Sequence, residues 1–292
     1  MKQTIVIFSD YTEIKKKAGR LYIETPKTKG SVPVTNIDGV LVFGKASITS
    51  EALSLCSSNN IPVIFLTTYG LIKGIVLPPY NSSFLYTRLT QVKLNLFNRL
   101  EVAKYIVKKK CLEIESTFGL DLEAIQLNIE KIQGFSQLLG IEGYASKLMF
   151  NSFSEMLKTT EFTFTERTYN PPPDEVNALL SFVYILGYNL SIGTILIKGF
   201  DPYISFLHVK KGAHAAFASD VLEILRPKLT YFVGQLIREN EVLKEDFEKR
   251  DNGYFLKKPV LTKILDRFNL MKEKLTNSIK EFLAELEKFK DD

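Results

Sequence analysis

The sequence predicts an α+β protein: a small N-terminal β-rich domain with one helix at residues 1–80, then a larger all-α domain at residues 81–292. In the first part, short β-branched apolar runs alternate with turn residues, which is typical of strands. From Phe84 onward, apolar residues recur every three or four positions, and Gly and Pro become rare until 169–174, which is typical of helices. With 45% hydrophobic residues, the 292-residue chain can fill one large core or two modest ones.

The first part of the chain contains apolar runs that predict strands. They are "TIVIFS", "RLYIET", "VLVFG", "IPVIFLT" and "GIVLPP". Between two of them, "ITSEALSLCSSNN" combines helical apolar spacing with a polar end. We therefore expect a single helix to cross over between two strands.

The second part contains two helical patterns near its middle. "GIEGYASKLMFNSFSEML", at 140–157, is typical of one helix. Asp174 follows three prolines and is placed to cap another helix, because its carboxylate can accept hydrogen bonds from the free amides of the first turn. Gly199 and Pro202 should end that helix.

The helix after Asp174 has no charged residue from Val176 to Ile197, a run long enough to span a bilayer. It carries polar residues and two glycines and lacks flanking basic clusters, so we expect a buried helix of a bundle and no membrane partner. Near the end of the sequence, apolar residues from Ile264 to Phe289 step by three or four, which predicts a long amphipathic helix.

The net charge and the two cysteines indicate which partners and which kinds of site are compatible with the sequence. The net charge of +5, from 38 Lys and Arg against 33 Asp and Glu, permits an acidic partner such as nucleic acid without requiring one. Cys56 and Cys111 lie in apolar, helix-like runs, which argues against a disulfide framework or a cysteine-ligated metal. The first ten residues have too short an apolar run for a signal peptide, so we expect a cytoplasmic protein.

Both histidines of the chain lie in "FLHVKKGAHAAFASDVLE", residues 206–223. Near its end, Asp220 and Glu223 are three apart in a helical pattern that is predicted to end at Arg226, before a proline. Their carboxylates should therefore share one face of a helix and could bind a cation together. On spacing alone, a solvated acidic face is the commoner explanation.

The other candidate ligand in this stretch is His208. If it continued the same helix, it would lie roughly 22 Å from Glu223, too far for one metal shell. A break at "KKG", residues 210–212, would let the chain double back and set the imidazole beside the acids. We therefore predict that Gly212 lies outside both helices. Without such a break, a lone histidine after an apolar run is usually a satisfied core group.

A third acid has to come from elsewhere, and Glu142 is the candidate. Gly140 and Gly143 flank it near the expected start of a helix, where glycines would allow close approach of another backbone or a ligand. An ordinary acid favoured by the helix dipole in a first turn is the alternative. One imidazole with carboxylates suits Mg²⁺ or Mn²⁺ better than zinc.

Four motifs in order point to a known family. "GIEGYASKLMF", "ERTYNPPPDEVNALLSFVYILGY", "KGFDPYISFLH" and "ASDVLEILRP" resemble the CRISPR-associated spacer integrases, the first protein of the Cas series. The N-terminal stretch "GVLVFGKASITSEALSLCSSNNIPVIFLTTYGLIKGIV" is similar to the β-domain of that family. The resemblance covers essentially the whole chain.

The resemblance assigns roles to residues of this sequence. It implies that Glu142, His208 and Glu223 bind the divalent metal and that these three and Asp220 are catalytic. The sequence departs from the family at "GAHAAFAS", where His214 stands near an expected basic position. The candidate DNA-contacting residues are Arg167, Asn177, Tyr184, Lys210 and Lys211.

The resemblance also implies a function and partners. We expect a metal-dependent DNA endonuclease and integrase of antiviral defence, which inserts protospacer DNA into a CRISPR array through attack of a 3′-hydroxyl on a phosphodiester. Its expected partners are protospacer and repeat DNA, a second copy joined through the N-terminal domain, and the small, nuclease-like second protein of the Cas series. The alternatives are a non-catalytic DNA-binding scaffold and a transposon-type integrase of the same family.

Overall fold

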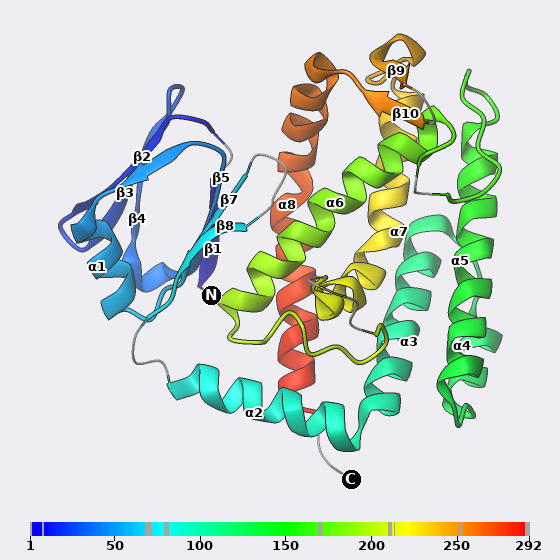
Figure 1. Ribbon diagram of the computed structural model, residues 1–292, viewed down its shortest axis with the longest axis horizontal. Helices are drawn as coiled ribbons and strands as arrows, with labels where there is room; N and C mark the ends of the chain where they lie inside the picture. Colours follow the sequence, from blue (N-terminus) through cyan, green and yellow to red (C-terminus); the bar gives the residue numbers. More distant parts are fainter. Residues whose placement is uncertain are drawn as a thin grey trace.

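The computed structural model shows a strand-rich N-terminal part followed by a mostly helical part, which confirms the predicted α+β class (Figure 1). The structure describes residues 2–7, 9–67, 72–78, 82–168, 171–209, 212, 214–250 and 253–289. The predicted domain boundary near residue 80 falls at residues 79–81, outside the described residues, so the division into two domains stays a prediction.

The N-terminal part contains two four-stranded sheets (Figure 1). In the first, β1 is parallel to β5 and β5 to β7, while β8 is antiparallel to β7. Its strands in spatial order are β1 (Gln3–Ile7), β5 (Ile37–Phe43), β7 (Val63–Leu66) and β8 (Ile72–Val76). The second contains, in spatial order, β4 (Lys29–Pro33), β3 (Arg20–Glu24), β2 (Thr12–Lys17) and β6 (Ala46–Ile48).

The predicted crossover helix is α1 (Ser50–Ser58), which joins the parallel strands β5 and β7. Thr49 caps it, because its hydroxyl accepts a hydrogen bond from the Ala52 amide at 3.3 Å. All five predicted strands are present, but β2, β4 and β6 were not predicted. Their sequences, "TEIKKK", "KGSVP" and "ASI", are rich in lysine, glycine or small residues, and each contributes only one or two apolar side chains, such as Ile14, Val32 and Ile48, to the core of the N-terminal part.

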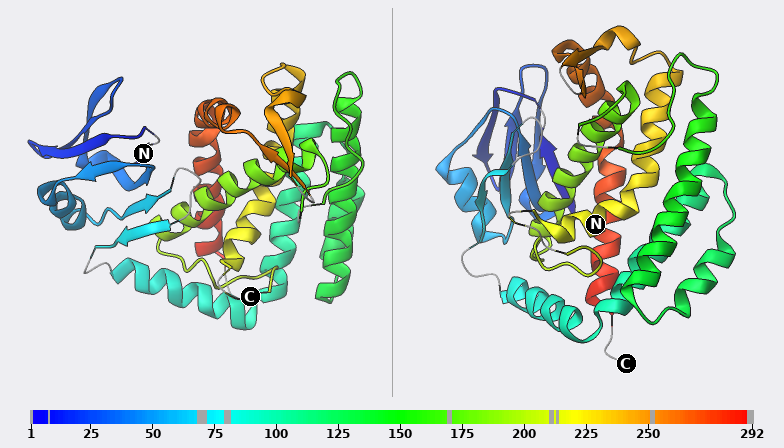
Figure 2. Two further views of the ribbon diagram at one scale, coloured as in Figure 1. Left: turned by 45° about the horizontal axis from the view of Figure 1, so that its top comes forward. Right: turned by 45° about the vertical axis from the view of Figure 1, so that its right-hand side comes forward.

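The helical part is built around α7, which packs against both α3 and α6, with α5 on the far side of α3 (Figures 1 and 2). Its elements are α2 (Ser82–Phe97), α3 (Arg99–Phe118), α4 (Glu123–Glu130), α5 (Phe135–Leu157), α6 (Glu175–Ile197), α7 (Ala216–Arg238), the hairpin β9 (Phe247–Arg250) and β10 (Gly253–Leu256), and α8 (Lys258–Glu287). The long amphipathic helix predicted near the end of the sequence is α8.

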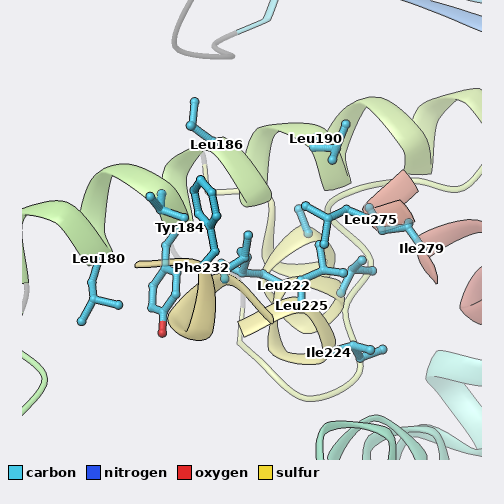
Figure 3. Close-up of a cluster of buried hydrophobic side chains, with 14 of the residues drawn as sticks. Leu180, Tyr184, Leu186, Leu190, Leu222, Ile224, Leu225, Phe232, Leu275 and Ile279 are labelled. Carbon is cyan, nitrogen blue, oxygen red and sulfur yellow. The ribbon is translucent and has the colours of Figure 1, made fainter. Parts of the chain in front are cut away.

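The charge-free run forms α6, a buried core helix. The Asp174 side chain caps it as predicted, by accepting a hydrogen bond from the Asn177 amide at 2.7 Å, and Gly199 follows its end with a φ of +82°. Among the described residues it is the one helix that is long and apolar enough to cross a membrane, but 78% of its apolar window is buried inside the protein. Figure 3 shows Leu180 and Tyr184 of α6 extending to the side of this helix on which Leu222, Leu225 and Phe232 of α7 lie, whereas Leu186 extends to the opposite side.

Close contacts join the first sheet to the helices. A Cβ at Gly193 of α6 would lie 2.7 Å from Leu41 Cδ2 of β5. One at Gly39 would lie 2.5 Å from Ile197 Cδ1, so both glycines permit the sheet and α6 to touch. Leu41 therefore belongs to the same hydrophobic cluster as the helices, whereas Val40 and Val42 of the same strand belong to a separate cluster within the N-terminal part.

Two predicted helix boundaries were wrong. The helix that holds Asp220 and Glu223 does not end at Arg226, because α7 continues through Pro227 to Arg238. A proline inside a helix leaves the carbonyl four residues earlier without its amide donor. Nearly every residue around Pro227 is buried, and packing against α3 and α6 holds the helix through this point.

The second wrong boundary concerns the surroundings of Glu142. The helix α5 begins at Phe135, so Glu142 lies well inside it rather than in its first turn. Outside the helix itself, no described residue has an atom within 4 Å of a Cβ built at Gly140 or Gly143. The close backbone approach predicted from these two glycines is therefore absent.

Candidate functional site

The chain reverses direction in the connection between α6 and α7, and His208 lies in this connection rather than in a helix. Gly212 lies in the connection rather than in either helix, and its φ of +58° is in the left-handed region that favours glycine. This reversal brings His208 back to the first turns of α7. The predicted DNA contacts Lys210 and Lys211 lie outside the described residues.

Asp220 organises the segment that carries His208. It is fully buried in α7. Its Oδ2 accepts hydrogen bonds from the amides of Phe206 at 2.6 Å and Leu207 at 3.1 Å. Its Oδ1 accepts the His208 amide at 2.9 Å and lies 2.8 Å from His208 Nδ1. Both carboxylate oxygens of Asp220 therefore accept hydrogen bonds from residues 206–208 and hold His208 in position.

The contact with Asp220 also fixes the imidazole tautomer. A carboxylate can only accept, so His208 Nδ1 carries the proton and Nε2 is left with a lone pair that can bind a metal. Burial lowers the pKa of His208, but the Asp220 hydrogen bond and the charge of Glu223 outweigh burial and raise it above its ordinary value. The His208 side chain is 36% exposed, so the imidazole is only partly buried.

Glu223 lies one helical turn after Asp220 and is almost fully buried. Its Oε1 is 3.7 Å from His208 Nε2 and 3.3 Å from Arg226 Nε, while its Oε2 accepts a hydrogen bond from Lys110 Nζ at 2.6 Å. Burial alone would raise the pKa of Glu223. The positive charges of Arg226, Lys110 and His208 outweigh burial and lower the pKa to about 2. Glu223 is therefore a carboxylate at neutral pH.

Glu142 joins this cluster through a lysine that the sequence reading missed. Lys110 Nζ, from α3, donates to Glu142 Oε1 and to Glu223 Oε2, and so links α5 to α7. Ser146 supports Glu142 one turn along α5, where its hydroxyl donates to the same oxygen at 2.9 Å. The sequence pattern does indicate that Lys110 is buried, because it lies four residues from both Ile106 and Ile114 and therefore on the core-facing side of α3.

Two of the candidate donor atoms lie close enough to be ligands of one divalent ion. The 3.7 Å between His208 Nε2 and Glu223 Oε1 is close to the roughly 3 Å that separates two neighbouring ligands of one octahedral ion. An imidazole nitrogen with carboxylate oxygens suits Mn²⁺ or Mg²⁺. Within the described ranges no group of three or more His, Cys, Asp or Glu side chains is arranged to hold a metal ion, because the Lys110 ammonium lies between Glu142 and Glu223 and keeps Glu142 out of such a group.

Three of the predicted DNA contacts form a network beside the cluster. The guanidinium groups of Arg167 and Arg226 lie 5.4 and 5.2 Å from the centre of the Tyr184 ring. Arg167 also donates to Asn177 Oδ1 at 3.0 Å. Asn177 is fully buried, so the structure places it beneath Arg167 rather than at the surface. Arg226 connects this network to Glu223, a link that the sequence did not predict.

The second histidine belongs to a different group. The His214 ring stacks on Tyr188 at a centroid distance of 5.1 Å, and its Nε2 lies 2.7 Å from Ser219 Oγ. Its Nδ1 lies 3.2 Å from the Tyr188 hydroxyl. Both ring nitrogens of His214 therefore have partners outside the cluster of Glu142, His208 and Glu223.

The fold resembles solved structures that cover nearly the whole chain. A Cas1 protein from Thermotoga maritima superposes with a TM-score of 0.70 and 23% identity, covering 98% of this chain and 96% of the other. A casposase bound to its integration product gives a TM-score of 0.74 at 20% identity, covering 99% and 96%. A Cas6-RT-Cas1–Cas2 complex gives 0.77 at 20% identity, covering 98% and 96%. At these identities the likeness concerns the fold alone.

Sequence comparison gives the family. The chain is 29% identical over 272 residues to a CRISPR-associated endonuclease Cas1 of Thermodesulfovibrio yellowstonii, covering 88% of this chain and 82% of the relative. It is 25% identical over 264 residues to the corresponding protein of Thermotoga maritima, covering 87% and 82%. The model of the family "CRISPR associated protein Cas1" matches residues 5–270. This protein therefore belongs to the CRISPR-associated Cas1 family.

Proposed function

We propose that this Cas1 protein is a divalent-metal-dependent DNA endonuclease and integrase whose site contains Glu142, His208 and Glu223. The observation that carries the proposal is the pairing of His208 Nε2 with Glu223 Oε1 at 3.7 Å, with Glu142 joined to the same cluster through Lys110. The related proteins are named Cas1 endonucleases, and a structural neighbour is a casposase bound to an integration product.

The residues of the chain prepare the site for phosphodiester chemistry. Asp220 holds His208 with its Nε2 lone pair available, and Glu223 stays ionised because its pKa is held near 2. Buried Lys110 closes the inner side of the cluster, whereas 36% of the His208 side chain and 20% of the Glu142 side chain are exposed, so a substrate approaches from these two residues. When bound, Mg²⁺ or Mn²⁺ supplies Lewis-acid polarisation of the phosphate.

The proposed reaction is a direct transesterification. A protospacer 3′-hydroxyl attacks a phosphorus atom of the repeat DNA. A new phosphodiester bond forms while the original P–O bond breaks and leaves a 3′-hydroxyl on the cut strand, so no covalent bond to the enzyme is needed. With water in place of the hydroxyl, the same site would nick DNA. We propose that Arg226 and Arg167, whose guanidinium groups both lie near the Tyr184 ring, attract the phosphate backbone.

The proposed partners follow from the related structures. These include a Cas1–DNA complex and Cas1–Cas2 assemblies, so we propose protospacer and repeat DNA and a small Cas2-type protein as partners of this chain. A homodimer formed through the N-terminal part is proposed on the family resemblance alone.

The test is strand transfer by the purified protein. A labelled protospacer duplex is joined to a repeat-containing plasmid in Mn²⁺, in Mg²⁺ and in EDTA. We expect product only with a divalent ion, and a loss of about 100-fold or more in Glu142→Gln and His208→Ala. His214→Ala and Glu113→Gln are matched controls, because His214 contacts Tyr188 and Glu113 pairs with Lys228 outside the cluster.

Two results would reject the proposal. One is full strand transfer in both cluster variants, and the other is product formation in EDTA. DNA binding that falls steeply with salt but never leads to a metal-dependent product would instead support a non-catalytic scaffold.

A further inference from the structure

We propose that the Lys110 ammonium lowers the affinity of the site for a divalent ion. In the metal-free protein it neutralises the carboxylates of Glu142 and Glu223, to which the ion would bind. The inference rests on the proposed metal role of Glu142, His208 and Glu223. It assigns to a residue of α3 a control over metal affinity that none of the sequence motifs suggests.

The first support is the complete saturation of the ammonium group. The Lys110 side chain is 1% exposed. Its Nζ contacts Glu142 Oε1, Ser146 Oγ at 2.7 Å and Glu223 Oε2 at 2.6 Å. An ammonium group has three N–H donors, and here each has an acceptor from the site. A buried lysine with all three donors committed to two proposed metal ligands and their supporting serine is held in one place.

The second support is that the two carboxylate oxygens of Glu223 have different partners. Oε2 faces Lys110, while Oε1 faces His208 Nε2 at 3.7 Å and Arg226 Nε at 3.3 Å. The inner oxygen is thus held by a cation of the chain, and the outer oxygen is on the side from which a metal ion would bind. This arrangement keeps the carboxylate aimed outward when no metal is bound.

The third support is charge balance. Two buried or half-buried carboxylates this close would repel each other, and Lys110 on the inside with Arg226 on the outside offsets both negative charges. A divalent ion therefore enters a cluster that already holds positive charge. At the effective dielectric of a protein site, one unit charge a few ångströms from a divalent ion changes its affinity by about tenfold or more.

The experiment measures Mn²⁺ affinity and thermal stability of the full chain in three lysine variants, and Mn²⁺ affinity also in His208→Ala and Glu142→Gln. Lys110→Met removes the charge and keeps an apolar chain of similar length, and Lys110→Gln removes the charge but keeps amide donors for the carboxylates. Lys109→Met is the matched control, because Lys109 is the neighbouring residue of α3 and pairs with Glu285 of α8 at 2.9 Å. The dissociation constant is obtained from free Mn²⁺ by electron paramagnetic resonance, and Tm is measured in EDTA and in Mn²⁺.

We expect both neutral Lys110 variants to bind Mn²⁺ about tenfold tighter or more than the unaltered protein. Their Tm in EDTA should fall, because two carboxylates lose their shared partner, and Mn²⁺ should raise it by more than it raises the Tm of the unaltered protein. Lys109→Met should match the unaltered protein in its Mn²⁺ affinity. The Gln variant answers the question if the Met variant does not fold.

Failure of the Lys110 inference can be distinguished from failure of the proposed metal site. If the unaltered protein binds Mn²⁺ and loses it in His208→Ala, while neither neutral Lys110 variant binds more tightly, Lys110 is only a structural ion pair and this inference is overturned. If the unaltered protein binds no Mn²⁺, or His208→Ala and Glu142→Gln leave its binding unchanged, the proposed metal site itself fails and takes this inference with it.

Discussion

The substitution Asp220→Asn tests how much the buried Asp220 carboxylate, which holds His208 in place, contributes to the stability of the protein. Asp220 is fully buried and receives four N–H groups, two at each carboxylate oxygen, from the amides of 206–208 and from the His208 imidazole. Asparagine keeps one oxygen but turns an NH₂ group toward the other two donors. Two hydrogen bonds to a charged acceptor are then lost, each worth about 1.5–3 kcal/mol.

The expected loss is therefore about 3–6 kcal/mol in the free energy of unfolding, taking both lost bonds together. At about 2 °C per kcal/mol for a chain of this size, Tm should fall by roughly 6–12 °C. The assay is thermal unfolding followed by circular dichroism, with Mn²⁺ affinity as a second reading that should weaken by about 10- to 100-fold. Asp201→Asn is the control, because its exposed carboxylate accepts one amide, that of Tyr203 at 2.8 Å.

The explanation of Asp220 as an anchor would be refuted by an Asp220→Asn protein whose Tm stays within about 2 °C of the unaltered protein. A fall of equal size in Asp201→Asn would also refute it, because that result would trace the loss to any change in the segment rather than to the buried carboxylate.

Two further predictions concern acid stability and helix packing. Glu223 has a pKa of about 2 in the folded protein against an ordinary 4.5, so its stabilising effect is present above pH 4.5 and is lost as pH falls toward 2. Tm measured from pH 6 to 2 should therefore fall more steeply in the unaltered protein than in Glu223→Gln, and parallel curves would contradict this. Gly187→Ala should cost about 1–3 kcal/mol in urea unfolding, because its Cβ would lie 2.5 Å from Leu229 Cδ1 of α7. Gly140→Ala, with open space around its Cβ, should be neutral or stabilising, and an equal loss in both variants would count against the packing argument.

The sequence predicted the parts of the site that depend on local chain geometry. His208 and Glu223 are fifteen residues apart, and a glycine break between two helical patterns was enough to infer that the chain turns back. The Asp174 cap of α6 was likewise predictable, because capping involves only neighbouring residues.

The remaining features depend on packing between distant segments. Lys110 meets Glu142 and Glu223 only after α3, α5 and α7 assemble, and no pattern in one helix reveals which acids its ammonium will contact. Pro227 was taken as a stop because a proline ends an isolated helix, whereas burial between α3 and α6 carries α7 through it. Asp220 was predicted to be catalytic beside the three metal ligands, but its hydrogen bonds to the amides of Phe206 and Leu207 could not be predicted from its spacing to Glu223.

The most direct test of the metal site is the position of the metal itself. Crystals of the protein grown with Mn²⁺ give an anomalous difference map that locates each bound manganese. Our account predicts a peak bonded to His208 Nε2 and Glu223 Oε1, with Glu142 as a further ligand or joined through a bound water. A fully loaded crystal whose manganese lies elsewhere, with no peak at His208, would contradict it.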